Sequence, residues 1–260
     1  DGSDEVRLTN SAEVDSYPTW SPDGRMIAFI SQTPAGDRAI FRMNEDGTNK
    51  VRITSIRSSP APLSWSPDGG RIAFQDADPQ LPGSYIFVVN IDGSNRRHLT
   101  ADNPYNPSSD TDPSWSPGGS RMLFSRYVPP GIVSVYAGPV LHTINPDGTQ
   151  LRVLPDGFMD GFGDLMPSWS PMGDKIIFIV NVWDFVNDIF IANADGTQRR
   201  FFHGCDWRDN SCGRDALDPK FSPDGTKIVF SMTDRFRRPF QMFVKNIDGT
   251  GLTLLADSAQ

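Results

Sequence analysis

The feature that most constrains this chain is a short segment that occurs five times with the same internal spacing. In each copy an aromatic residue is followed directly by Ser-Pro, by Gly four positions after the aromatic and by Phe nine positions after it. The aromatic residues recur every 45 to 54 residues. A repeat of this length indicates one supersecondary unit per copy, stacked on its neighbours. The copies are TWSPDGRMIAF (19–29), SWSPDGGRIAF (64–74), SWSPGGSRMLF (114–124), SWSPMGDKIIF (168–178) and KFSPDGTKIVF (220–230).

A second pattern follows each copy of the first. A short apolar run ends in Asn, and Asp-Gly begins two positions after that Asn, as in IFVVNIDGS. Gly takes the positive φ angles that tight turns require, while Asn and Asp side chains hydrogen-bond to the turn backbone. The Pro-Asp-Gly of the first pattern predicts a turn for the same reasons. Each unit is therefore predicted to contain four strands joined by turns, with the third strand ending at Asn44, Asn90, Asn145, Asn193 or Asn246.

Alternating residues in the second and third strands of each unit give the predicted sheet two apolar faces. Such a sheet is not stable alone, and a closed ring of stacked copies is a β-propeller. We therefore predict an all-β single domain over residues 1–260, built from four-stranded antiparallel blades. The repeated Trp and Phe residues are expected to pack between blades, and His142, in a slot that is Phe in the other repeats, is expected in the core. The predicted blades cover residues 15–54, 60–100, 110–154, 164–202 and 216–256.

The repeat resembles a known family at this point. WSPDG, a hydrophobic strand and then NxDGT with a later Leu-Thr are similar to the TolB-type, WD40-like propeller repeat called PD40. The resemblance covers residues 1–256, and it implies a propeller that is usually six-bladed. TolB itself carries a separate α/β domain before its propeller, and this sequence contains no counterpart of that domain. The resemblance is specific to the repeat and much less specific to any one protein of the family.

The first ten residues, DGSDEVRLTN, repeat the fourth-strand pattern seen in DGTNKVRIT (46–54) and DGSNRRHLT (92–100). They are surplus to five complete blades, and two interpretations stay open. In a five-bladed ring, residues 1–10 add to the outer edge of the last blade and close the ring. In a six-bladed, TolB-like ring, they are the last strand of a blade whose first three strands are missing. Such a gap would expose an apolar blade face, so five blades are favoured if the chain is complete.

The net charge of the chain limits the classes of partner, and its two cysteines indicate the cellular compartment. The formal net charge of −8 argues against a nucleic-acid partner, which needs a basic face. No apolar run approaches the roughly 20 residues that span a bilayer, so no membrane span is predicted. Cys205 and Cys212 flank a short polar loop and lack the further Cys or His of a zinc site, and we expect a disulfide there. A disulfide implies an exported protein, periplasmic or extracellular.

Loops between the second and third strands, and between successive blades, are expected to share one face and carry function. In the third to fifth repeats these loops are rich in aromatic residues and Arg, which commonly anchor interfaces. The alternative is that the aromatics only cover the ends of the blades. The predicted partner-binding residues are Tyr127, Tyr136, Trp183, Phe185, Arg235, Arg237 and Arg238.

Two groups of carboxylates are further candidates. Asp156, Asp160 and Asp164 lie in a Gly-rich loop that could bind Ca²⁺, although the spacing is not that of an EF-hand and a solvated acidic loop is the alternative. Acidic residues also stand three or five positions before the blade aromatic, where the first strands line the channel. They could hold a cation or the amino group of a peptide, or cap the strand starts. This second group is Asp15, Asp112, Asp164 and Asp218.

The sequence favours a binding protein over an enzyme. It contains no GxSxG, HExxH or GxxxxGK motif, and its three His do not form a metal centre. No cofactor is implied beyond the candidate Ca²⁺. The leading hypothesis is a non-catalytic exported propeller that binds a protein, peptide or glycan on its loop-rich face. The alternatives are the substrate-gating propeller of a larger prolyl-oligopeptidase-like hydrolase and a carbohydrate-active propeller enzyme that uses channel carboxylates.

Overall fold

The computed structural model describes residues 6–100, 109–128, 138–155, 163–182, 186–204, 216–233 and 241–256, and every structural statement below concerns these ranges. They belong to two compact units, residues 4–122 with 144–151, and residues 1–3 with 123–143 and 152–260.

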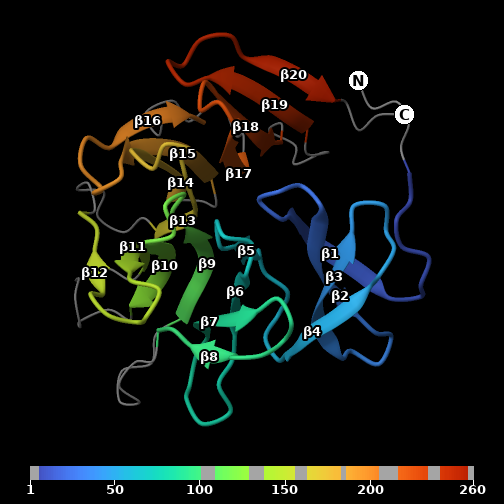
Figure 1. The fold of residues 1–260 in the computed structure, drawn as a ribbon. Helices are drawn as coiled ribbons and strands as arrows, with labels where there is room; N and C mark the ends of the chain where they lie inside the picture. The colour runs from blue at the N-terminus through green and yellow to red at the C-terminus, as the bar shows by residue number, and fades with distance from the viewer. Residues whose placement is uncertain are drawn as a thin grey trace. The chain divides into compact units, whose positions relative to one another are not determined.

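The described strands form five four-stranded antiparallel sheets, called blades 1 to 5 (Figure 1). In every sheet the strands lie side by side in chain order. This confirms the predicted all-β, five-bladed propeller. Blade 1 contains β1 (Val14–Trp20), β2 (Met26–Gln32), β3 (Arg38–Asn44) and β4 (Val51–Ile56), and blade 2 contains β5 (Ser64–Trp65), β6 (Arg71–Asp76), β7 (Tyr85–Asn90) and β8 (Arg97–His98). Blade 3 contains β9 (Ser109–Trp115), β10 (Met122–Val128), β11 (Gly138–Ile144) and β12 (Arg152–Val153). Blade 4 contains β13 (Gly163–Trp169), β14 (Lys175–Val182), β15 (Val186–Asn193) and β16 (Arg200–His203), and blade 5 contains β17 (Ala216–Phe221), β18 (Lys227–Met232), β19 (Gln241–Asn246) and β20 (Thr253–Ala256).

The repeated turns follow from side-chain hydrogen bonding. In the β3–β4 turn, Gly47 has φ 83° and its N–H donates to Asn44 O at 3.0 Å. Asp46 Oδ1 accepts from both the N–H and the hydroxyl of Thr48, at 2.9 and 2.6 Å. These donors stabilise the ionised carboxylate and lower the pKa of Asp46. The same arrangement lowers the pKa of the aspartates in the matching turns of the other blades, Asp92, Asp147, Asp195 and Asp248.

Neighbouring blades pack through the fourth strand of one and the core of the next. Ile53 of β4 belongs to the same buried cluster as Ile72 and Phe74 of blade 2. The turn that follows β7 also approaches β4 closely, because a Cβ on Gly93 would lie only 2.7 Å from Ile53 O. Glycine is therefore needed at this turn both for its φ of 87° and for the contact between blades.

The segment before β1 repeats this contact on blade 1. Leu8 packs against the buried cluster of Ile27, Phe29 and Met43, and a Cβ on Gly47 would lie 2.7 Å from Leu8 O. Leu8 therefore packs against blade 1 in the same way that Ile53 packs against blade 2. Residues 6–13 nevertheless form no strand, and among the described residues β20 pairs only with β19.

The Phe residues that end the five repeated segments are buried, whereas burial varies at the first aromatic position, where Trp169 and Phe221 are half-buried. Trp65 and Trp115 are 7% and 6% exposed, and Trp65 Nε1 donates to Thr19 O of the preceding blade at 3.1 Å. His142 stacks on Phe124, with ring centroids 5.8 Å apart, as expected of a core residue. Trp20, in contrast, is 56% exposed. The expectation that it packs between blades is wrong for the described residues, because no strand precedes β1 among them.

In three blades a cation lies over one or both of the paired Phe rings and also binds a carboxylate. The positive group lies over the negative face of the ring and neutralises an acid at the same time. In blade 3 the corresponding position is Leu151, and Arg126 from β10 lies over Phe124 instead, at 5.4 Å. The three cations are Lys50 (4.7 Å from the Phe41 centroid, 2.9 Å from Glu13), Arg96 (4.8 Å from Phe87, 2.5 Å from Asp76) and Arg199 (4.6 Å from Phe178, 2.7 Å from Asp164).

Candidate functional site

Most of the predicted partner-binding residues lie outside the described ranges. Of the aromatic and Arg residues, only Tyr127 is described: it lies on β10 and its exposed fraction is 40%. The predicted interface on the loops of blades 3 to 5 therefore stays a prediction, as do the disulfide and the calcium loop. The residues outside the described ranges are Tyr136, Trp183, Phe185, Arg235, Arg237, Arg238, Asp156, Asp160, Cys205 and Cys212.

The carboxylates before the blade aromatics do not form one class. Asp112 and Asp218 stand directly before a Pro and have φ angles of 55° and 51°, in the left-handed region. In blade 5 this position is a bulge, since the β17–β18 register shifts between Leu217 and Lys220. Asp15 and Asp164 stand two positions earlier and belong to regular ladder pairs, opposite Ser31 and Val180.

The ladder carboxylates are structural in their contacts. Both oxygens of Asp164 accept hydrogen bonds from Arg199, at 2.7 and 2.8 Å, and its side chain is nearly buried. Asp15 Oδ1 lies 3.9 Å from Lys50 Nζ. Asp110 of blade 3 has the same spacing before Trp115 and is fully buried. The sequence analysis did not select Asp110, although the five-residue spacing was a sufficient signal.

The described part of the chain contains neither a membrane-spanning helix nor a metal-binding cluster. No helix in it is long and apolar enough to cross a bilayer. No three His, Cys, Asp or Glu side chains in it lie where they could share a metal ion.

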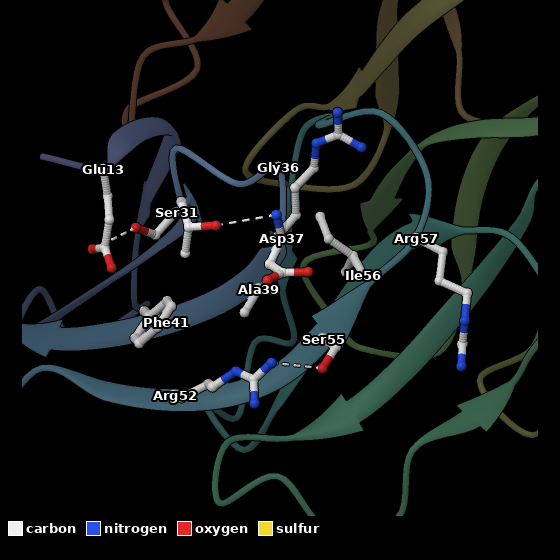
Figure 2. Close-up of a pocket in the computed structure, with 12 residues that line it drawn as sticks. Glu13, Ser31, Gly36, Asp37, Ala39, Phe41, Arg52, Ser55, Ile56 and Arg57 are labelled. Atoms are coloured by element: carbon white, nitrogen blue, oxygen red, sulfur yellow. Dashed lines mark hydrogen bonds between the residues drawn. The ribbon is translucent and has the colours of Figure 1, made fainter.

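A cavity of about 720 Å³ opens in blade 1, at the end where the β2–β3 loop and the segment after β4 meet (Figure 2). Its volume lies within the range of about 300–1,000 Å³ that is usual for ligand pockets. The lining combines charged, hydroxyl and apolar groups. It consists of Glu13, Ser31, Thr33, Gly36, Asp37, Arg38, Ala39, Phe41, Arg52, Ser55, Ile56 and Arg57. We call it the blade 1 pocket.

One wall of the blade 1 pocket is a tight loop. Thr33 N–H donates to Asp37 O and Gly36 N–H donates to Thr33 O, both at 2.9 Å. Thr33 Oγ1 also accepts from Asp37 N–H at 3.1 Å. Gly36 has φ 94°, which favours glycine. These hydrogen bonds hold the backbone of Asp37, and therefore the base of its side chain, in one position.

The opposite wall is held by a carboxylate from the next blade. Asp76 is fully buried, and its Oδ1 accepts the N–H groups of Arg57 and Ser58 at 2.6 and 2.9 Å. Its Oδ2 accepts from Arg96 Nη2 at 2.5 Å. The backbone that carries Arg57 is thus anchored to the core of blade 2, although the Arg57 side chain is exposed.

The charged groups of the pocket differ in how far they are already paired. Glu13 accepts from Lys50 and from the Ser31 hydroxyl, which lower the pKa of Glu13. Arg52 Nη2 donates to Ser55 Oγ at 2.7 Å (Figure 2). Within the described ranges, neither the Asp37 carboxylate nor the Arg57 guanidinium has a hydrogen-bond partner.

The charged and hydrogen-bonding side chains that line the blade 1 pocket are those of Glu, Asp, Arg, Ser and Thr residues. Its lining contains neither His nor Cys, so its hydroxyl groups have no general base beside them other than carboxylates. The sequence analysis missed this pocket because it selected loops by aromatic content, and the loop Thr33–Asp37 contains no aromatic residue. The available signal was the set of three Arg at strand ends in one repeat, Arg38, Arg52 and Arg57.

Comparison with known proteins gives one family. Residues 1–156 match the family model described as PD40, TolB beta propeller domain. The protein TolB homolog of Chlorobium luteolum is 31% identical over 171 residues, which are 65% of this chain and 32% of that protein. The chain thus spans about a third of the length of this curated relative.

Solved structures agree on the fold. The putative TolB from Agrobacterium tumefaciens has a TM-score of 0.70 at 20% identity and covers 95% of this chain and 82% of its own. TolB from Acinetobacter baumannii has a TM-score of 0.70 at 18% identity, covering 93% and 54%. An oligogalacturonate lyase from Vibrio parahaemolyticus has a TM-score of 0.66 at 12% identity, covering 98% and 70%. At these identities the likeness concerns the fold alone.

Proposed function

The chain belongs to the PD40 family of TolB β-propeller domains, and from that premise we propose that it is a non-catalytic propeller that binds a protein or peptide partner. The face that binds is the one formed by the loops between second and third strands and by the segments between blades. Propeller scaffolds are rigid and their loops vary, so recognition belongs on the loops.

The observation that carries the proposal is the blade 1 pocket. It lies on the expected face, between the β2–β3 loop and the start of the segment after β4. It offers guanidinium groups beside an apolar floor, which is the combination found in protein interfaces. Its walls are fixed by the Thr33–Asp37 loop and by Asp76, so little ordering is needed on binding.

We further propose that the protein is exported, to the periplasm or the cell exterior. Support comes from the expected Cys205–Cys212 disulfide, a bond that persists in oxidising compartments. Fractionation of the source cells, with thiol alkylation before and after reduction, tests both parts. Protein found only in the cytoplasm with two free thiols would contradict the proposal.

The function is tested by blocking the pocket. Ser55 is exposed on β4 and lines the cavity, so Ser55→Trp fills it without disturbing the core. Arg25→Trp, in the β1–β2 turn at the opposite end of β2, is the matched control. Both variants should keep the thermal stability of the intact protein.

The intact protein and the control should retain the same partner from an envelope or culture extract, and Ser55→Trp should not. The purified partner should then bind the intact protein in solution with a Kd that Ser55→Trp raises at least tenfold. Equal binding by all three proteins would contradict a pocket on this face. Turnover of polygalacturonate or of peptide substrates by the purified protein would contradict the non-catalytic part.

A further inference from the structure

Resting on the proposed function, we infer that the blade 1 pocket recognises an extended peptide segment of the partner in which an acidic side chain stands next to an apolar one.

The charge of the pocket is opposite to that of the chain. Glu13 is neutralised by Lys50, at 2.9 Å. The remaining charged groups in the lining are the carboxylate of Asp37 and the guanidinium groups of Arg38, Arg52 and Arg57. A local excess of positive charge on a protein of net charge −8 favours an anionic group at this position over the rest of the surface.

The unused donors point to a carboxylate. Arg38 uses Nε and Nη1 for Gln32 Oε1 and Ser58 O, at 3.0 and 3.3 Å, so it mainly shapes the wall. Arg52 uses only Nη2, for Ser55, and the Arg57 guanidinium has no partner in the described part of the chain. Guanidinium groups bind carboxylates through paired, charge-assisted hydrogen bonds. Arg52 and Arg57 are therefore the residues in the lining that have free donors for an acidic group.

The floor of the pocket suits an apolar side chain better than a sugar. Ala39 and Ile56 are buried, and they are joined there by Phe41. Sugars and bases use open aromatic faces, but Lys50 Nζ lies 4.7 Å above the Phe41 ring and Phe29 stacks beside it at 6.0 Å. The Phe41 face under Lys50 is thus occupied. An aliphatic side chain needs only the hydrocarbon surface, and burial of that surface is favourable.

Asp37 completes the recognition of a peptide. Asp37 lines the pocket together with Ala39 and Ile56 (Figure 2). It can accept a main-chain N–H of the bound segment, a donor that an extended peptide supplies at every residue other than Pro. A free inorganic anion or a small dicarboxylate has no N–H group to donate to Asp37. Its negative charge would also repel the Asp37 carboxylate.

The test selects random heptapeptides displayed on phage against the intact protein, with competition by the Ser55→Trp variant to remove binders of other surfaces. Enriched peptides should share Asp or Glu directly beside Leu, Ile, Val or Phe. Their synthetic copies should bind the intact protein in fluorescence anisotropy. Replacing the acidic residue by its amide should weaken binding about tenfold or more, as expected on losing charge-assisted hydrogen bonds.

Variants of the protein locate the acidic group. Arg57→Gln and Arg52→Gln should each raise the Kd of the selected peptides about tenfold, while Arg25→Gln, exposed at the other end of β2, should leave it unchanged. Enriched peptides without an acidic residue, equal binding by all variants, or no enrichment would each overturn the inference. So would an oligogalacturonate that binds at Arg57 when no peptide does.

The two proposals fail in different ways. A partner that binds the intact protein, not Ser55→Trp, and is indifferent to Arg52→Gln and Arg57→Gln would keep the proposed function and overturn the acidic segment. A partner that binds Ser55→Trp as well as the intact protein would contradict the proposed function itself.

Discussion

Asp76 and Arg57 belong to different blades, and the buried carboxylate of Asp76 accepts the main-chain N–H of Arg57 at 2.6 Å. The same oxygen accepts from Ser58 and Ala77, and the other oxygen from Arg96. One side chain of blade 2 therefore sets the position of one wall of the blade 1 pocket. Loss of this carboxylate should affect stability and binding together.

Asp76→Asn should lower the free energy of unfolding by about 3–5 kcal/mol, the range for removing one partner of a buried ion pair. The Arg96 guanidinium would keep its position over Phe87 without its counterion. Urea unfolding measures the change, and Glu45→Gln at an exposed position serves as the control. If the variant folds, the Kd of a pocket ligand should also rise. An unchanged unfolding midpoint would show that Asp76 does not anchor this wall.

The fold was predictable from the sequence because its determinants are local. Ser-Pro-Asp-Gly and Asn-x-Asp-Gly specify turns within a few residues, and the alternation between them specifies strands. The blade 1 pocket was not predictable in the same way. It depends on Asp76 reaching Arg57, nineteen positions earlier, and on Arg52 lying beside Ser55 across a bulge in the β3–β4 ladder. Sequence spacing reports neither contact.

The carboxylates before the blade aromatics illustrate the same limit. Their spacing of three or five residues was visible, but their separation into bulge and ladder positions was not. A Pro follows Asp112 and Asp218 directly and does not follow Asp15 or Asp164, and this difference was the available signal. The structure then places these two residues at positive φ.

Leu8→Ala tests whether the first residues act as the outer strand of a blade. Leu8 is half-buried against Ile27, Phe29 and Met43, so truncation should cost about 1–2 kcal/mol, roughly half of a full core truncation. Val6→Ala, at a side chain that is 76% exposed, should cost nothing measurable. Thermal and urea unfolding of the two variants give the comparison. Equal stabilities would mean that Leu8 contributes no packing.

The turn aspartates make stability depend on acid pH. Hydrogen bonds from Ser222 and Thr226 lower the pKa of Asp224 to about 2, from an ordinary value of 3.8. A carboxyl group whose pKa is lower in the folded state contributes stability above its unfolded pKa, and that contribution is lost as pH falls through the folded pKa. The free energy of unfolding should therefore be level above about pH 5 and fall between about pH 4 and pH 2.

Asp224→Asn should reduce the steepness of that acid-induced fall, since it removes one of the groups that titrate in the window. Asp37→Asn is the control, because within the described ranges the Asp37 carboxylate has no hydrogen-bond donor. Urea unfolding at half-unit pH intervals measures the slopes. A slope that Asp224→Asn leaves unchanged would mean that other carboxylates dominate acid unfolding.

The cations over the Phe rings should contribute more to the free energy of unfolding where their ion pairs are more deeply buried. Arg199 and Asp164 form a nearly buried, bidentate pair, with side-chain exposures of 12% and 5%, whereas Lys50 and Glu13 are 29% and 31% exposed. Replacing Arg199 by Leu removes two hydrogen bonds from a nearly buried carboxylate in blade 4 and should cost about 3–5 kcal/mol. Replacing Lys50 by Leu should cost about 1 kcal/mol or less, because solvent screens the pair. Urea unfolding of the two single variants measures both costs.

A double variant distinguishes two causes of the stability loss in Arg199→Leu. One is loss of the ion pair with Asp164, and the other is loss of the contact with the Phe178 ring. Blade 3 already carries Leu151 at the position of the cation, which shows that the repeat accommodates an aliphatic side chain there. Asp164→Asn combined with Arg199→Leu removes the negative charge of Asp164 while the Phe178 face stays uncovered. If loss of the ion pair causes the destabilisation, the double variant should regain most of the stability that Arg199→Leu loses. If it stays as unstable as the single variant, the contact between Arg199 and Phe178, at 4.6 Å, is the dominant contribution.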